Sequence, residues 1–196
     1  MGVPHPYPRG LAGCWGCRVL GNKMRIMQLP QAQTPKPLQS VLFVCMGNIC
    51  RSPSAHGVFR DKLRAHGLEH RVKVDSAGTH SYHRGEPPDP RSQRHAAARG
   101  YDLSDLRSRP LHEDDFKRFD LILVMDWDNL ALTQQRCPKP EEHKIRRLSE
   151  FSQRHNSTVI PDPYSGGTDG FERVLDLIED ACDGLLRHIQ NKQRAD

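Results

Sequence analysis

The segment from residue 41 to residue 53 constrains the fold more than any other part of the chain. Val41 to Val44 form a β-branched and aromatic run that is typical of a buried parallel strand. Glycine and asparagine follow this run, Pro53 then suits the first position of a helix, and Gly67 suits its end. The segment therefore predicts a strand, a tight loop and a helix that begins where the loop ends.

Short apolar strands and helical patterns continue to alternate along the chain. The sequence predicts strands over residues 72–74, 121–124 and 143–148, and helices over residues 90–99, 128–135 and 171–189. Gly100 is suited to end the first of these helices. Because strands that alternate with helices pair as a parallel sheet, we expect an α/β fold.

The excess of positive charge is confined to the first 38 residues. The formal net charge is +5, and no Asp or Glu precedes Asp61. Five basic residues lie before residue 39, and beyond it the 24 Asp and Glu residues are matched by as many Lys and Arg residues. Nucleic-acid binding needs a broad basic face. The balanced charge of the rest of the chain therefore predicts no nucleic-acid partner.

Residues 1–38 also differ from the rest in composition. They contain six prolines with scattered glycine and glutamine. This composition neither builds a periodic helix nor fills a core. The remaining length suits one globular domain. The sequence therefore predicts a disordered, proline-rich, basic head over residues 1–38 and one domain over residues 39–196.

The cysteine pattern and the hydropathy indicate the cellular compartment of the protein. Six cysteines at irregular spacing favour a reducing compartment over a disulfide-rich secreted domain. No apolar stretch is long enough to span a bilayer or to act as a secretory signal. The histidines share no metal-ligand spacing. We expect a cytoplasmic monomer with no membrane partner, no metal and no cofactor.

A thiol and a guanidinium stand at the two ends of the arc from Cys45 to Arg51, between a strand and a helix. Ligands of open α/β sheets bind at the carboxyl ends of strands, where a helix amino terminus attracts anions. The same helix dipole favours a thiolate, which makes Cys45 a predicted nucleophile. The planar fork of Arg51 can hold two phosphate oxygens. The loop therefore predicts hydrolysis of a phosphomonoester through a phosphocysteine intermediate.

Neighbouring residue types support this hypothesis. Ser52 can donate a hydrogen bond to the sulfur, and Gly47 and Asn48 tolerate the unusual torsions of a tight cradle. A simpler interpretation, a buried cysteine beside a solvated arginine, explains each residue singly but not all of them together. The reaction also needs a carboxyl group as acid and base. Asp162 is a candidate, although an Asp between two prolines is more often a turn residue.

Residues 41–53 resemble the signature of low-molecular-weight protein tyrosine phosphatases. Residues 75–79, 88–91 and 162–164 agree with the same family in the same order, and the resemblance covers about residues 39–190. It implies three layers, with a four-stranded parallel sheet flanked by helices on both faces. It also implies hydrolysis of phosphotyrosine in protein substrates and of other aryl phosphates.

The resemblance implies a role for each site residue. Cys45 is the nucleophile, Arg51 binds the phosphoryl group, and Asp162 is the general acid and base. The residues that bind phosphate or support the loop are Met46, Gly47, Asn48, Ile49, Cys50, Ser52 and Ser76. By the same resemblance, Tyr82 and Tyr164 flank the substrate ring.

Three related functions are weighed against this one. Protein-arginine phosphatases are similar but carry threonine at the position of Ile49, so Ile49 favours an aryl ester. Arsenate reductases share the fold but pass oxidising equivalents to grouped cysteines, whereas Cys137 and Cys182 lie on separate predicted elements. A phosphotyrosine-binding protein without activity would not need a thiol at position 45.

The second thiol of the loop has two interpretations, which the sequence leaves open. Cys50 is predicted as a redox partner that would trap an oxidised Cys45 as a disulfide and spare it from irreversible oxidation. Its alternative role is simple packing of the loop.

Overall fold

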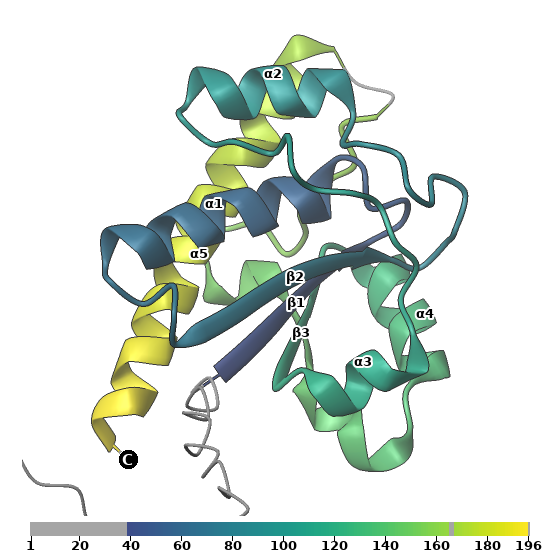
Figure 1. The fold of residues 1–196 in the computed structure, drawn as a ribbon, viewed down its shortest axis with the longest axis vertical. Helices are drawn as coiled ribbons and strands as arrows, with labels where there is room; N and C mark the ends of the chain where they lie inside the picture. Colours follow the sequence, from purple (N-terminus) through teal and green to yellow (C-terminus); the bar gives the residue numbers. More distant parts are fainter. Residues whose placement is uncertain (1–38, 165–166, 196) are drawn as a thin grey trace, which may run out of the picture. The chain divides into compact units, whose positions relative to one another are not determined.

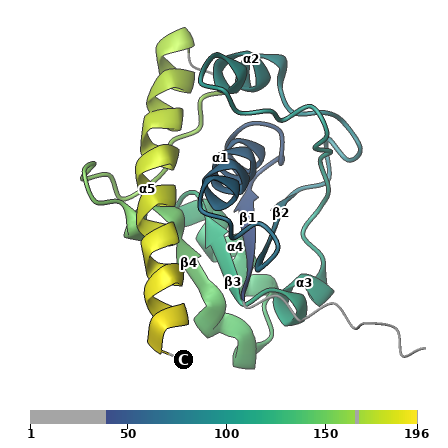
Figure 2. The ribbon, with the colours of Figure 1, turned by 60° about the vertical axis from the view of Figure 1, so that its left-hand side comes forward.

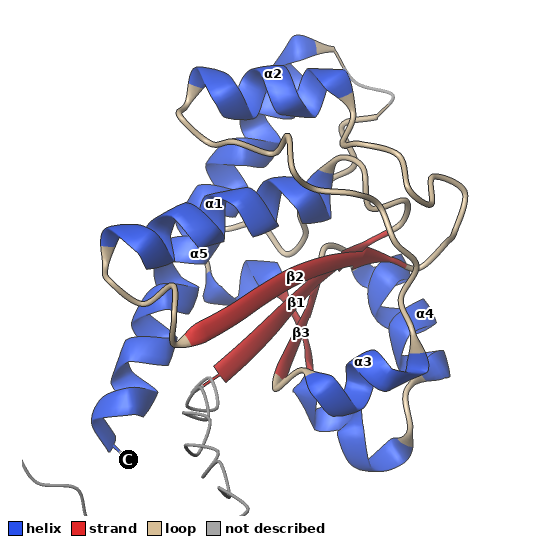
Figure 3. Cartoon of the chain, viewed as in Figure 1, coloured by secondary structure: helices blue, strands red, loops and turns tan. Residues whose placement is uncertain are grey.

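The computed structural model describes residues 39–164 and 167–195, which contain a parallel sheet with helices on both faces (Figures 1 and 3). The strands are β1 (Gln39–Cys45), β2 (Val72–Gly78), β3 (Leu121–Val124) and β4 (Ile145–Arg147). Their order across the sheet is β2-β1-β3-β4, and each neighbouring pair is parallel. The predicted α/β class with a four-stranded parallel sheet is confirmed.

Five α-helices and two short 3-10 helices complete the described part of the chain. They are α1 (Arg51–Ala65), α2 (Pro90–Ala98), α3 (Glu113–Arg118), α4 (Trp127–Arg136), η1 (Lys139–Lys144), η2 (Leu148–Phe151) and α5 (Thr168–Ala195). Helices α1 and α5 cover one face of the sheet, while α3 and α4 lie on the other (Figure 2).

Strand β1 lies inside the sheet and contributes to the core on both of its faces. Val41 and Phe43 pack into the cluster that holds the apolar residues of α1 and α5. Leu42 and Val44 pack into the opposite cluster with Phe116 of α3. All four of these strand side chains are 0 % exposed. A strand buried on both faces needs a continuous apolar run, which explains the uninterrupted sequence before Cys45.

The structure corrects some predicted boundaries. Helix α1 begins at Arg51, two residues before Pro53, because proline is tolerated anywhere in the first turn, where N–H groups have no partner within the helix. Its end and that of α2 agree with the prediction, since Gly67 and Gly100 follow them with positive φ angles of 65° and 89°.

Other elements differ in length from their predictions. Strand β2 runs on to Gly78, four residues past its predicted end, because Ser76 and its neighbours pair with β1 although they are not strongly apolar. Strand β4 has three residues rather than six, and its flanks form 3-10 turns. Helix α3 was not predicted, since six residues are too few for a helical period to stand out.

Residues 1–38, predicted as a disordered head, lie outside the described residues. Within the part that is described, no helix combines the length and apolarity needed to cross a membrane. The carboxyl ends of β1 and β3 meet at one edge of the sheet, since the two strands are parallel neighbours. This edge places Cys45, the loop that follows it and Asp126 close together.

Candidate active site

The loop from Cys45 to Ser52 carries an unusual backbone conformation at Asn48, whose φ angle is 55°. A left-handed conformation costs a non-glycine residue about 1 kcal/mol. The Asn48 amide offsets this cost, since its nitrogen donates to Ser52 Oγ and Ser76 Oγ, each at 2.9 Å. Its oxygen accepts a hydrogen bond from the Arg109 N–H at 2.9 Å. These contacts hold the loop in its curved form, and they bring together the predicted support residues Asn48, Ser52 and Ser76.

The sulfur of Cys45 lies at the base of this loop, and the residue is 3 % exposed. The Asn48 N–H donates to Sγ at 3.3 Å, and Ser52 Oγ lies 3.1 Å from it. Ser52 Oγ accepts from Asn48, and its one hydrogen has two acceptors within reach, the Cys45 sulfur at 3.1 Å and the Ala77 carbonyl at 3.3 Å. The Asn48 N–H and the Ser52 hydroxyl group therefore both lie within hydrogen-bond distance of the sulfur.

Arg51, which opens α1, is buried and contacts two carboxylates. Its side chain is 2 % exposed, with one nitrogen 2.5 Å from Asp126 Oδ2 and the other 2.7 Å from Asp162 Oδ2. The first nitrogen also donates to the Ile160 carbonyl at 3.2 Å. Burial opposes the charge of the guanidinium, but Cys45, Asp126 and Asp162 together raise the pKa of Arg51 above its usual value. The arginine therefore stays charged and oriented at the loop.

Asp162 reaches the site from a segment that is 111 residues from Arg51 in the chain. The Ile160 N–H donates to the Met125 carbonyl at 2.7 Å, which ties this segment to the end of β3. Asp162 Oδ1 accepts from the Tyr164 N–H at 3.1 Å, and the Asp162 side chain is 44 % exposed. One of its oxygens thus faces Arg51, while the carboxyl group stays accessible from solvent.

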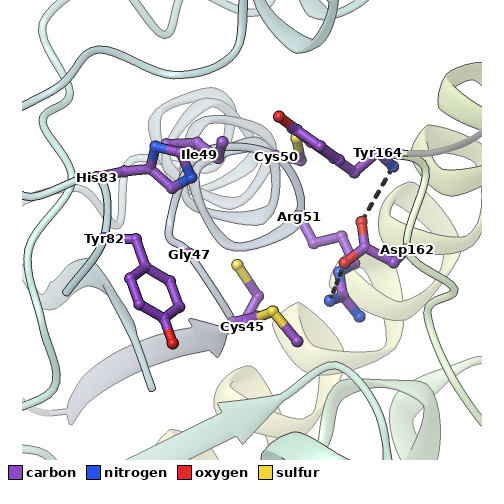
Figure 4. A pocket seen from close by; sticks show the side chains of 10 residues that line it. Cys45, Gly47, Ile49, Cys50, Arg51, Tyr82, His83, Asp162 and Tyr164 are labelled. Carbon is purple, nitrogen blue, oxygen red and sulfur yellow. Dashed lines mark hydrogen bonds and ion pairs between the residues drawn. The ribbon is translucent and has the colours of Figure 1, made fainter. Parts of the chain in front are cut away.

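These groups line one pocket with a volume of about 370 Å³. The lining residues are Cys45, Met46, Gly47, Ile49, Cys50, Arg51, Tyr82, His83, Asp162 and Tyr164 (Figure 4). Tyr82 and Tyr164 are 75 % and 54 % exposed and stand on different sides of the Cys45 sulfur. All of the predicted catalytic and ring-contact residues therefore meet here, and of the predicted loop residues only Asn48, Ser52 and Ser76 lie behind the lining.

Two residues of the site were not predicted. Asp126 is the N-cap of α4, where its Oδ1 accepts from the Asn129 N–H at 2.7 Å. Aspartate is a favoured N-cap residue, so its position between an apolar strand and a helix is recognisable in the sequence, but nothing local reveals its contact with Arg51. His83 lies over Gly47 and hydrogen-bonds Glu86 at 2.7 Å. No spacing in the sequence points to His83.

The remaining described cysteines differ in their relation to the site. Cys50 lines the pocket, and burial raises the pKa of its thiol to about 12. It also packs against Ile49 and Phe171. Cys137 and Cys182 are buried on α4's carboxyl end and on α5, outside the pocket lining, and burial raises the pKa of both thiols. No second thiol from these elements reaches the pocket of the described chain.

A thiol and a buried arginine at the two ends of one loop between a strand and a helix are the arrangement found in phosphatases that carry cysteine in their phosphate loop. Comparison with known proteins narrows this class. The sequence profile of the low molecular weight phosphotyrosine protein phosphatase family matches residues 40–195. The chain belongs to this family and is an enzyme of the protein-tyrosine-phosphatase class.

Relatives and solved structures agree with this assignment. A putative low molecular weight protein-tyrosine-phosphatase of Synechocystis is 43 % identical over 76 % of this chain and 95 % of its own length. The human low molecular weight phosphotyrosine protein phosphatase is 37 % identical over 76 % of this chain and 94 % of its own. A crystal structure of protein tyrosine phosphatase from Entamoeba histolytica has a TM-score of 0.77 and 42 % identity, and covers 79 % of this chain and 99 % of its own.

Proposed function

We propose that this enzyme hydrolyses phosphotyrosine in proteins, and small aryl phosphates, in two steps through a phosphocysteine intermediate. The observation that carries the proposal is the meeting of Cys45, Arg51 and Asp162 in one pocket, with the Asn48 N–H and the Ser52 hydroxyl group within hydrogen-bond distance of the sulfur. The same loop supplies a helix amino terminus and the guanidinium for a phosphate dianion.

In the first step the Cys45 thiolate attacks phosphorus, and the bond between phosphorus and the phenolic oxygen breaks. The electron pair of that bond goes to the phenolic oxygen, which takes a proton from the Asp162 carboxyl group. Arg51 stays with the phosphoryl oxygens as charge redistributes among them. The partly exposed position of Asp162 beside Arg51 suits it to meet the leaving group at the mouth of the pocket.

In the second step the Asp162 carboxylate takes a proton from water, and the water oxygen attacks phosphorus. The bond between phosphorus and sulfur breaks, and its electron pair returns to Cys45 as thiolate. Ser52 stabilises the departing sulfur with its hydroxyl hydrogen. Met46, Gly47, Asn48, Ile49 and Cys50 form the cradle, and Ser76 steadies it through Asn48.

The walls of the pocket favour an aromatic leaving group. We propose that the substrate ring lies between Tyr82 and Tyr164, where aromatic side chains gain contact area with little loss of freedom. Ile49 adds an apolar surface in the same lining. An apolar residue at this position offers no hydrogen bond to a guanidino group, so we favour phosphotyrosine over phosphoarginine.

We also propose that Cys50 protects the nucleophile from irreversible oxidation. Peroxide would oxidise Cys45 to the sulfenic acid, and the Cys50 thiol would then displace water to form a disulfide, which added thiol would reduce. Because the pKa of Cys50 is raised to about 12, this closure should be slow near neutral pH. Reactivation after peroxide should be lost in Cys50→Ala. Unchanged recovery in that variant would leave packing against Phe171 as the role of Cys50.

The reaction needs a free thiol and no electrophilic metal, so we propose a cytoplasmic enzyme without cofactor, and we propose that it acts as a monomer. Four described cysteines are free, which suits a reducing compartment. The partner is a phosphotyrosine protein, with no role for nucleic acid or membrane. We further propose that residues 39–196 act as one domain and that residues 1–38 take no part in catalysis.

Two variants test the proposed function. Cys45→Ser should abolish hydrolysis of p-nitrophenyl phosphate, and Asp162→Ala should bind phosphotyrosine peptides with little turnover. Capture of phosphotyrosine proteins by Asp162→Ala, displaced by orthovanadate, would support the assignment. Capture of phosphoarginine proteins would refute it, and so would full activity of Cys45→Ser.

A further inference from the structure

The pair formed by Asp89 and Arg91 has no role in the reaction described above. Asp89 is the N-cap of α2, 9 % exposed, and accepts the Arg91 N–H at 2.8 Å. The Arg91 guanidinium also donates to both carboxylate oxygens of Asp89, at 3.1 and 2.8 Å. The hydrogen bonds from Arg91 lower the pKa of Asp89. This bidentate contact gives the guanidinium a defined orientation.

The same pair connects two parts of the active site. The Asp89 N–H donates to the Ile49 carbonyl at 2.8 Å, which joins it to the Cys45–Ser52 loop. The Arg91 guanidinium donates to the Tyr164 carbonyl at 3.1 Å and lies 5.2 Å from the centre of the Tyr164 ring. Asp89 and Arg91 therefore bridge the loop that carries the nucleophile and the segment Asp162–Tyr164, which we call the acid segment.

Aromatic packing reinforces this bridge. The Arg91 guanidinium lies 4.8 Å from the centre of the Phe171 ring, at the amino end of α5. Phe171 packs against Ile49 and Cys50. A guanidinium placed over the faces of two aromatic rings is attracted to both of them. The bridge thus rests on contacts to the loop, to the acid segment and to α5.

The position of Tyr164 in turn determines that of the Asp162 carboxylate. Asp162 Oδ1 accepts from the Tyr164 N–H, as the dashed line in Figure 4 marks, while Oδ2 meets Arg51. Arg91 holds the carbonyl of the same residue 164. A shift of the Tyr164 backbone would therefore turn Asp162 away from the position in which it meets the leaving oxygen.

We infer that Arg91, oriented by Asp89, is a positioning residue for the general acid. It holds the acid segment against the Cys45–Ser52 loop, so that Asp162 can protonate the leaving phenolic oxygen. The inference rests on the proposed function, in which Asp162 is that acid. It acts through Asp162 and not through the Cys45 sulfur, whose hydrogen-bond partners are Asn48 and Ser52.

The test compares kcat/KM for aryl phosphates whose leaving phenols differ in acidity. The value of kcat/KM reports on the steps up to formation of the phosphoenzyme. Among leaving phenols, the more basic ones depend more strongly on protonation by the general acid. Arg91→Met keeps a stem that can cover Phe171 and removes every side-chain donor, while the backbone N–H to Asp89 remains. We expect about a tenfold loss for phenyl phosphate and phosphotyrosine peptide, and less than about twofold for 2,4-dinitrophenyl phosphate. Alkylation of Cys45 by iodoacetate should keep its wild-type pH profile.

Arg94→Met is the matched control, since Arg94 is an exposed arginine on the same helix. It should behave as wild type with every substrate. If Arg91→Met loses kcat/KM equally for all leaving groups, or alters the alkylation profile, the inference is wrong and Arg91 has a general structural role. Should Arg91→Met fail to fold, Arg91→Lys carries the same comparison, because lysine cannot reach Asp89 and Tyr164 with a fork.

Asp162→Asn separates this inference from the proposed function. It should show a steeper dependence on leaving-group acidity than any Arg91 variant. If Asp162→Asn shows that dependence and Arg91→Met does not, only the positioning role fails. If Asp162→Asn shows none, the proposed acid is wrong and the inference falls with it.

Discussion

Replacement of Asp126 by alanine tests how far catalysis depends on a residue that touches Arg51 but takes no part in proton transfer. Asp126 lies 2.5 Å from the guanidinium, which is 2 % exposed and also contacts Asp162 and the Ile160 carbonyl. In Asp126→Ala the buried cation loses one of its two carboxylates. Its remaining carboxylate is Asp162, the proposed acid, so the variant also strengthens the hold of Arg51 on that group.

The size of the effect follows from two separate contacts of Asp126. Loss of a hydrogen bond to a charged group costs about 2 kcal/mol. Loss of the cap on the Asn129 N–H of α4 costs about 1 kcal/mol more. A domain of this size should then melt roughly 6–12 °C lower. A guanidinium displaced by about 1 Å should lower kcat/KM on the order of 10- to 100-fold.

Steady-state kinetics with a phosphotyrosine peptide and thermal melts, each with and without inorganic phosphate, measure these quantities. Asp126→Asn is the matched variant, because asparagine caps a helix as well as aspartate does. It should recover the roughly 1 kcal/mol due to the cap but none of the activity, since its amide cannot replace a carboxylate on Arg51. Phosphate should stabilise both variants less than wild type.

The kinetic measurements test whether catalysis depends on the contact between Asp126 and Arg51. If kcat/KM of Asp126→Ala stays within about threefold of wild type, Arg51 is held well enough by Asp162 and Ile160, and the reasoning from the short contact is refuted. If Asp126→Asn regains full activity, the cap rather than the charge is what the site requires.

Three further predictions concern the nucleophile, pH and packing. Ser52→Ala should slow turnover about tenfold. It should also move the pH dependence of Cys45 alkylation by iodoacetate to higher pH, and an unchanged pH dependence would contradict a hydrogen bond from Ser52 to the sulfur. Burial lowers the pKa of His56 to about 4, below the value of about 6.5 in the unfolded chain. As the pH falls from 6.5 to 4, His56 takes up a proton in the unfolded chain but not in the folded one. The free energy of unfolding, measured by urea titration, should therefore fall by about 3 kcal/mol over this range. His56→Leu should not show this fall. Gly184→Ala should lower the melting temperature by more than about 6 °C, because its Cβ would lie 1.8 Å from the Phe151 carbonyl oxygen, whereas Gly170→Ala, with 3.8 Å of space, should not.

The order of strands and helices was predictable because each depends on a local pattern. The apolar run before Cys45, the glycines after α1 and α2, and the spacing of apolar residues in α5 each describe one element. Helix α3 and the full length of β2 escaped prediction, because their residues gain stability from neighbours distant in sequence. Ser76, for example, lies in β2 because that strand pairs with β1.

The residues of the site also differ in whether a local sequence pattern could identify them. The loop from Cys45 to Ser52 contains the predicted nucleophile and the predicted phosphate clamp within eight residues, so its proposed chemistry follows from residue types and from the strand and helix at its ends. The acid could not be distinguished from a turn residue by spacing, and Asp162 was assigned to it by resemblance to a family. Asp126 was not predicted at all, although it makes the shorter contact with Arg51.

By itself, the amino-acid sequence determined the α/β class and predicted a loop for binding phosphate, since both follow from short-range periodicity and from residue types in one segment. Only the tertiary structure decided which carboxylates meet Arg51 and which side chain contacts the segment Asp162–Tyr164. Parallel pairing brings the carboxyl ends of β1 and β3 to one edge, and the contacts of Ile160 bring Asp162 there across 111 residues. Such meetings depend on how whole elements pack, which no local pattern of residues specifies.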